Sequence, residues 1–184
     1  MANAKTKASD LFDLFAEDLL AERNARPLII IGAAKIDDQL LEIIRGFLLP
    51  KRAKPKDPDE LLEGETPLGT FSARIKICHR LGLIDDTLCK SLERLRVMRN
   101  LSAHSISFDH GRSPVREHIV EFNNQIGGRR SYRLTKERYF DEDPRQGIEE
   151  LQCLLLTLCV LLEAIREKVR RTSGHKKALG ISSK

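Results

Sequence analysis

The chain has 184 residues, 41% of them hydrophobic, and a formal net charge of +5 at pH 7. That length fits one domain with a buried core. Aromatic residues make up only 5% and tryptophan is absent, so the core must be built mainly from aliphatic side chains, as is typical of packed helices. The small positive excess fits binding to nucleic acid or another polyanion, and it fits ordinary solubility equally well.

The cysteine and histidine patterns exclude the familiar disulfide and metal frameworks. The four cysteines form no C-x-x-C pair, and the histidines show no ligand spacing with acidic residues on one helix. The polar N-terminus lacks the apolar core of a signal peptide, and no apolar run reaches the roughly 18 residues of a membrane-spanning helix. We therefore expect a cytoplasmic protein with reduced thiols, no metal or cofactor, and no membrane contact.

Helical spacing of apolar residues dominates the first part of the chain. Ser9 is the predicted N-cap of a first helix, and Pro27 lies in the first turn of a second helix that ends at Pro50. The second helix carries two adjacent apolar rows, which predict burial over a broad face. The rows are Ile29, Ala33, Ile36, Leu40, Ile43, Phe47 and Ile30, Ala34, Asp37, Leu41, Ile44, Leu48.

The middle of the chain begins with a predicted loop over residues 51–65, which are rich in Lys, Pro and Asp. A third helix follows Pro67 and stops at Gly82. A fourth helix starts near Asp85 and runs past Arg99, because its apolar residues recur at helical spacing.

The last third is less regular before its final helix. Residues 113–122 predict a short helix, which two consecutive glycines end, and the basic segment 129–140 is expected to be extended. Pro144 opens the last helix, whose apolar residues keep a heptad seam over residues 148–169.

These elements predict an all-α fold. We expect an up-down bundle of four or five long helices, with an irregular basic insertion before the last one. Residues 1–171 are the predicted domain, and the polar, basic residues 172–184 are a predicted disordered tail.

Three charged residues interrupt the apolar rows. Asp37 lies between Ala34 and Leu41, Arg74 lies on the inner side of the third helix, and Arg99 continues the apolar row of the fourth. A buried charge is costly unless it is paired, so we expect Asp37 to form a network with the two arginines. Such a network is either a structural salt bridge that sets helix register or part of a polar pocket between helices.

Arg99, Asn100 and His104 form a second group of interest. Arg99 and His104 are separated by about 140° around a helix axis, whereas Asn100 and His104 share a face. An arginine that stabilises phosphate charge and a histidine that acts as general acid or base suit metal-free phosphodiester cleavage by a nucleic acid's own 2′-OH. The alternative is a helix-end histidine that caps a carbonyl group.

A basic stretch with interleaved tyrosines is the third candidate. Its cations could contact the phosphate backbone of RNA or DNA while a tyrosine stacks on a base, and the alternative is a solvated loop or hairpin. The cations are Arg129, Arg130, Arg133, Lys136 and Arg138.

Residues 67–77 read P-L-G-T-F-S-A-R-I-K-I, and residues 81–84 read L-G-L-I. This run resembles the mannitol operon repressor family, which shows a similar P-L-G-x-x-S-x-R-x-K element, then L-G-x-I and an R-x4-H segment. The resemblance covers residues 27–122 and, more loosely, the last helix. It implies an all-helical transcriptional regulator that lacks an obvious DNA-binding domain and acts through a partner. The basic residues 129–138 match nothing in that family pattern.

The segment from Arg99 to His104 also resembles the motif of HEPN domains, which are helical bundles. In many of them the Arg and His line a cleft at a two-fold dimer interface and cleave RNA without metal, and others are inactive RNA-binding or antitoxin-partner modules. We therefore expect a non-enzymatic transcriptional regulator, repressor-like and homodimeric, that acts by protein–protein contact. A HEPN-type endoribonuclease or inactive HEPN module is the alternative, and direct nucleic-acid binding by residues 129–138 is a third possibility.

Overall fold

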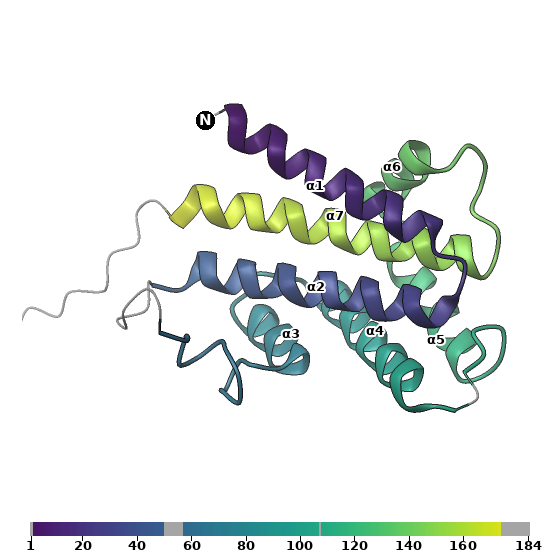
Figure 1. Ribbon diagram of the computed structural model, residues 1–184, viewed down its shortest axis with the longest axis horizontal. Coiled ribbons are helices and arrows are strands. Elements are labelled where there is room, and N and C mark those ends of the chain that lie inside the picture. Colours follow the sequence, from purple (N-terminus) through teal and green to yellow (C-terminus); the bar gives the residue numbers. More distant parts are fainter. Residues whose placement is uncertain (1, 50–56, 107, 174–184) are drawn as a thin grey trace, which may run out of the picture.

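The computed structural model describes residues 2–49, 57–106 and 108–173, with side chains described between residues 12 and 169. Every regular element in these ranges is an α-helix (Figure 1), and none of the helices described there is long and apolar enough to span a membrane. The helices are α1 Ala2–Ala21, α2 Ala25–Phe47, α3 Phe71–Arg80, α4 Asp86–His104, α5 Val115–Ile126, α6 Arg130–Tyr139 and α7 Ile148–Ser173. The predicted all-α bundle is confirmed, and α1, α2, α4 and α7 are its long helices.

Polar caps start three helices where the sequence places them. The side chains of Asn24, Thr70 and Asp85 each accept a hydrogen bond from a backbone N–H in the first turn of α2, α3 and α4, respectively. Gly82, just beyond the end of α3, has a φ of 68°, a left-handed conformation that glycine adopts without strain. Local chemistry therefore sets these boundaries.

The basic segment is the main correction to the sequence-based prediction. The expected irregular insertion consists of two short helices, α5 and α6, and the residues expected to be extended form α6. The reason is that Tyr132, Thr135 and Tyr139 fall on one side of a helix, where Thr135 is buried and both tyrosines pack against the core. The helical spacing of these three residues is not evident in the sequence because most of the residues around them are basic or polar.

The two ends of the chain also differ from the prediction. α1 begins at Ala2 rather than at Ser9, since no residue in between breaks a helix. α7 continues through Ser173, two residues into the predicted tail, and residues 174–184 lie outside the part of the chain that the structure describes.

α2 is the central helix, in contact with α1, α3, α4 and α7 (Figure 1). Gly32 on α2 packs against Leu155 on α7. About two turns further along α2, Gln39 Nε2 donates to the backbone oxygen of Cys159 at 3.0 Å, and Cys159 lies about one turn after Leu155 on α7. Because the residue numbers of the contacting pairs increase along both helices, α2 and α7 run in the same direction. A Cβ atom on Gly32 would lie 2.8 Å from Leu155 Cδ1, so the missing side chain permits this close approach.

A buried amide holds the C-terminal end of α1. Gln152 on α7 is 1% exposed, and its Nε2 donates to the backbone oxygens of Leu19, Leu20 and Glu22 at 3.1, 2.9 and 3.0 Å. The last carbonyl groups of a helix have no partner within the helix itself. Gln152 therefore satisfies two of them, those of Leu19 and Leu20, and ties α1 to α7.

Replacing Gly32 with valine should lower the free energy of unfolding by about 1–3 kcal/mol, the usual cost of overpacking a core. The added methyl groups would force α2 and α7 apart at Leu155. Urea denaturation followed by circular dichroism measures the change. Ala164→Val, at an exposed position of α7 outside the α2 groove, is the control and should cost less than about 1 kcal/mol. Equal losses in the two variants would contradict the assigned packing.

Candidate functional site

A groove of about 550 Å³ lies between α2, α3 and α4. An apolar lining with a few charged groups is the usual composition of a binding surface. The apolar part is formed chiefly by Ile30, Ala33, Ala34, Leu41 and Phe71, and the charged side chains are Asp37, Asp38, Arg74 and Arg99. The groove thus gathers all three residues of the predicted polar network, together with the exposed Asp38.

Asp37 and Arg74 form the predicted ion pair. Arg74 Nη1 donates to Asp37 Oδ1 at 2.8 Å, and the remaining nitrogens Nε and Nη2 donate to the backbone oxygens of Leu68 and Leu62 at 3.0 and 3.1 Å. Arg74 is 9% exposed, so its charge is buried, and each of its three guanidinium nitrogens donates to an acceptor. The pair ties the loop before α3 to α2 and α3, which favours the structural interpretation.

Arg99 does not belong to that network, contrary to the prediction. Its side chain is exposed, and its Nη1 donates to Asn100 Oδ1 at 3.3 Å. Asp37 is already paired with the guanidinium of Arg74. In the second half of α4 the buried side of the helix is formed by Met98 and Ser102, so Arg99 points away from the core. The buried network is therefore the Asp37–Arg74 pair, with Arg99 at the solvent-exposed wall of the same groove.

The last turns of α4 carry the group predicted for phosphodiester chemistry. Arg99 and His104 are both exposed, Asn100 is half-buried, and His104 is the final residue of the helix. Arg26 holds the helix end in place by donating from Nη2 to the backbone oxygen of Ser105 at 2.9 Å. No hydrogen bond joins Arg99 to His104 in the described structure, so the two side chains do not contact each other through a polar bond within one chain.

The described residues offer little other catalytic chemistry. No three Asp, Glu, His or Cys side chains among them are placed to hold a metal ion. Cys78, Cys153 and Cys159 are buried free thiols, and burial raises the pKa of Cys78 and Cys159 to about 12. These two cysteines remain protonated near neutral pH and serve packing rather than nucleophilic attack.

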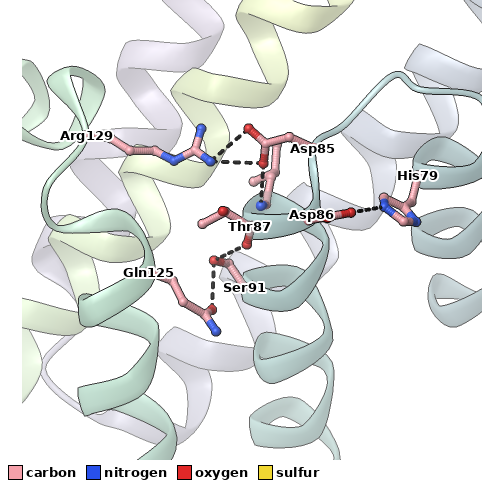
Figure 2. Close-up of polar contacts among 8 residues, drawn as sticks. His79, Asp85, Asp86, Thr87, Ser91, Gln125 and Arg129 are labelled. Atoms are coloured by element: carbon pink, nitrogen blue, oxygen red, sulfur yellow. Dashed lines mark hydrogen bonds and ion pairs between the residues drawn. The ribbon is translucent and has the colours of Figure 1, made fainter.

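Arg129, the first cation of the basic segment, belongs to a polar cluster at the start of α4 (Figure 2). Its Nη2 donates to both carboxylate oxygens of Asp85 at 2.9 Å, and beside them His79 Nε2 lies 2.6 Å from Asp86 Oδ1. Burial by itself would raise the pKa of Asp85. Hydrogen bonds from the Leu88 N–H and from Arg129 outweigh burial and lower that pKa below its usual value.

The other cations of the segment are also partly engaged. Lys136 pairs with Asp143, and Arg138 Nη2 lies 2.9 Å from Asp13 Oδ1 on α1. Three of the five cations predicted to contact nucleic acid therefore already face carboxylates. The two that are exposed and make no ion pair with a described residue are Arg130 and Arg133.

Replacing Asp85 with asparagine should destabilise the protein at pH 7 by up to about 1 kcal/mol, because an exposed ion pair is lost while the N-cap acceptor is kept. A carboxylate with a lowered pKa stabilises the fold above its unfolded pKa of about 3.9, and that stabilisation is lost as the pH falls through the folded pKa. The difference in unfolding free energy between wild type and variant should thus shrink between pH 6 and pH 3, by urea denaturation. Arg129→Gln is the matched control and should show the same trend. A difference independent of pH would contradict the assignment.

Comparisons with known proteins identify the fold. No protein-family model matches the chain, and no curated protein sequence does. YggD of Shigella flexneri 2a str. 2457T, described as a possible transcriptional regulator, is 12% identical with a TM-score of 0.57, over 86% of this chain and 96% of that one. MtlR of Escherichia coli, solved in complex with HPr, is 19% identical with a TM-score of 0.55, over 86% of this chain and 98% of that one. The chain therefore has the helical fold of YggD and MtlR.

Proposed function

We propose that this chain is a transcriptional regulator, related to the mannitol operon repressors, that acts through protein–protein contact rather than through a DNA-binding motif. The observation that carries the proposal is the groove along α2 on a chain with the MtlR fold. The groove lies on three helices, so its shape is held by the same packing that forms the core.

The exposed side of α2 has the chemistry of a protein interface. Ile30 and Ile31 are 39% and 42% exposed, and Ala34 beside them is also exposed. Covering aliphatic side chains on a rigid helix gives a favourable free energy of about 25 cal/mol per Å² of apolar surface removed from water. Asp38 and Arg99 stand beside these apolar residues, as charged residues do at the rim of an interface.

MtlR was solved with HPr, which makes HPr the first partner to examine for this chain. We propose that the protein is a cytoplasmic homodimer. Its role as a repressor would then depend on binding the partner. The resemblance of residues 67–84 to the mannitol operon repressors supports this role, because that stretch supplies the Arg74 anchor and one wall of the groove.

Ile30→Arg should abolish binding to purified Escherichia coli HPr, measured by isothermal titration calorimetry, because it places a charge on the apolar wall of the groove. Leu134→Arg is the matched control. Leu134 is 50% exposed on α6 and does not line the groove, so this variant should bind like wild type. If HPr does not bind and a native pull-down recovers no protein but the chain itself, the proposed function is wrong.

A metal-independent ribonuclease is the second candidate function. It is favoured by the exposure of Arg99 and His104 on the final turns of α4, where RNA could reach both. Asn100 would orient His104 from the same face of the helix. Arg99 would stabilise the phosphate charge, and His104 would move the proton of the 2′-OH.

Purified protein should then cleave single-stranded RNA in the presence of EDTA, and Arg99→Ala or His104→Ala should each reduce the rate by about 100-fold or more. A gel assay with end-labelled RNA measures the rate, and His110→Ala is the control for loss of an unrelated histidine. Cleavage that survives both substitutions would rule out these residues as the catalytic pair.

Direct nucleic-acid contact through residues 129–138 has less support. Arg129, Lys136 and Arg138 would have to leave carboxylate partners before they could neutralise phosphates. Tyr132 and Tyr139 both pack against the core, so neither tyrosine of the segment presents a free ring for stacking on a base.

A further inference from the structure

The first half of one of the two apolar rows on α2 is left uncovered by the single chain. The sequence predicts that both rows are buried, and the row through Ile29 and Ile36 is indeed buried as far as Ile43. In the adjacent row, Ile30 is 39% exposed and Ala34 is exposed, while Leu41 is half-buried. A helix with a broader apolar face than its own chain covers has room for a further protein surface on that face.

The free charges of the groove have opposite signs. Asp37 and Arg74 neutralise each other, which leaves Asp38 and Arg99 as the exposed charges of the lining. Neither of these two makes an ion pair with another described residue. The groove thus carries one accessible negative and one accessible positive charge, and a partner must supply one of each to satisfy both.

The two charges lie at different levels along α2. The hydrogen bond from Arg26 to Ser105 joins the start of α2 to the end of α4, so these helices run in opposite directions. Arg99 therefore lies beside the first half of α2, where it lines the groove together with Ile30. Asp38 lies further along, about two turns after Ile30.

We propose that a second copy of this chain occupies the groove, with the two α2 helices antiparallel across a two-fold axis near Ala34. The two-fold axis reverses the direction of α2, so Asp38 of each copy faces Arg99 of the other. With the axis at Ala34, Ile30 of one copy lies level with Asp38 of the other and about one turn from its Leu41, and the small side chain of Ala34 lets the helices approach closely.

Self-complementarity distinguishes a second copy from other occupants. A two-fold interface uses the same patch twice, so a patch with one acid and one base on opposite sides of its centre can satisfy itself. A partner with a strong charge of one sign would leave Asp38 or Arg99 facing a like charge, which is unfavourable. This inference rests on the proposed function, because it concerns the same protein-contact groove: a second copy fills the groove in the free protein, and HPr must displace that copy to bind there.

Charge reversal provides the test. Wild type should sediment as a dimer in analytical ultracentrifugation, and Asp38→Arg and Arg99→Asp should each raise the dimer dissociation constant by at least about 10-fold, because like charges meet twice in each homodimer. The double variant should dimerise again. A mixture of the two single variants should form a mixed dimer, in which every facing pair is opposite in sign. Arg133→Asp, an exposed reversal on α6 outside the groove, is the control and should remain dimeric.

A monomeric wild type, or single variants that dimerise as strongly as wild type, would overturn the inference. So would a double variant and a mixture that both stay monomeric while circular dichroism shows folded helices. The proposed function fails separately. If wild type is monomeric but binds HPr, then HPr occupies the groove and the second copy is excluded. If the charge reversals weaken the dimer and the double variant restores it, but HPr does not bind and no other protein is recovered, the dimer is supported and the proposed function is wrong.

Discussion

The close contact between α2 and α7 at Gly32 is the constraint on which the rest of the bundle depends. A residue without a side chain lets Leu155 reach the backbone of α2, and the two longest helices then lie together in the same direction. α1 packs against both, with Gln152 holding its end, and α3 and α4 pack against α2 elsewhere (Figure 1). Once these contacts are made, only the outer side of α2 remains open.

The polar groups of the bundle support that arrangement at its edges. Arg74 connects α2, α3 and the preceding loop through three acceptors, and Arg26 holds the end of α4. Asp85 caps α4 and receives Arg129 from the segment before α6 (Figure 2). A buried charge that is hydrogen-bonded through each of its nitrogens fixes the relative orientation of the elements it joins, and this is the role of Arg74.

Both candidate functions use the same end of the molecule. The groove along α2 has the apolar and charged composition of a protein interface, and Arg99 contributes to its wall. The same arginine begins the segment that suggests RNA chemistry, and His104 ends it. Arg99 is therefore the residue that the two proposals share.

Much of the fold is present in the local sequence. The spacing of apolar residues, the caps at Thr70 and Asp85, and Gly82 after α3 identify the helices, because helix formation depends on residues three to four apart. The Asp37–Arg74 pair was also predictable, since two opposite charges on apolar rows have few other partners. The helix α6 was missed because its buried side is formed by two tyrosines and a threonine in a basic sequence.

The sequence alone determined that this chain forms long amphipathic helices and that α2 has a broad apolar face. Only the tertiary structure decided that the row through Ile29 is covered while Ile30 and Ala34 of the other row stay open, that Arg99 faces solvent, and that Arg129 pairs with Asp85, 44 residues away. The physical reason is that periodicity describes a helix by itself, whereas exposure and ion pairing depend on which neighbours cover it and at what distance.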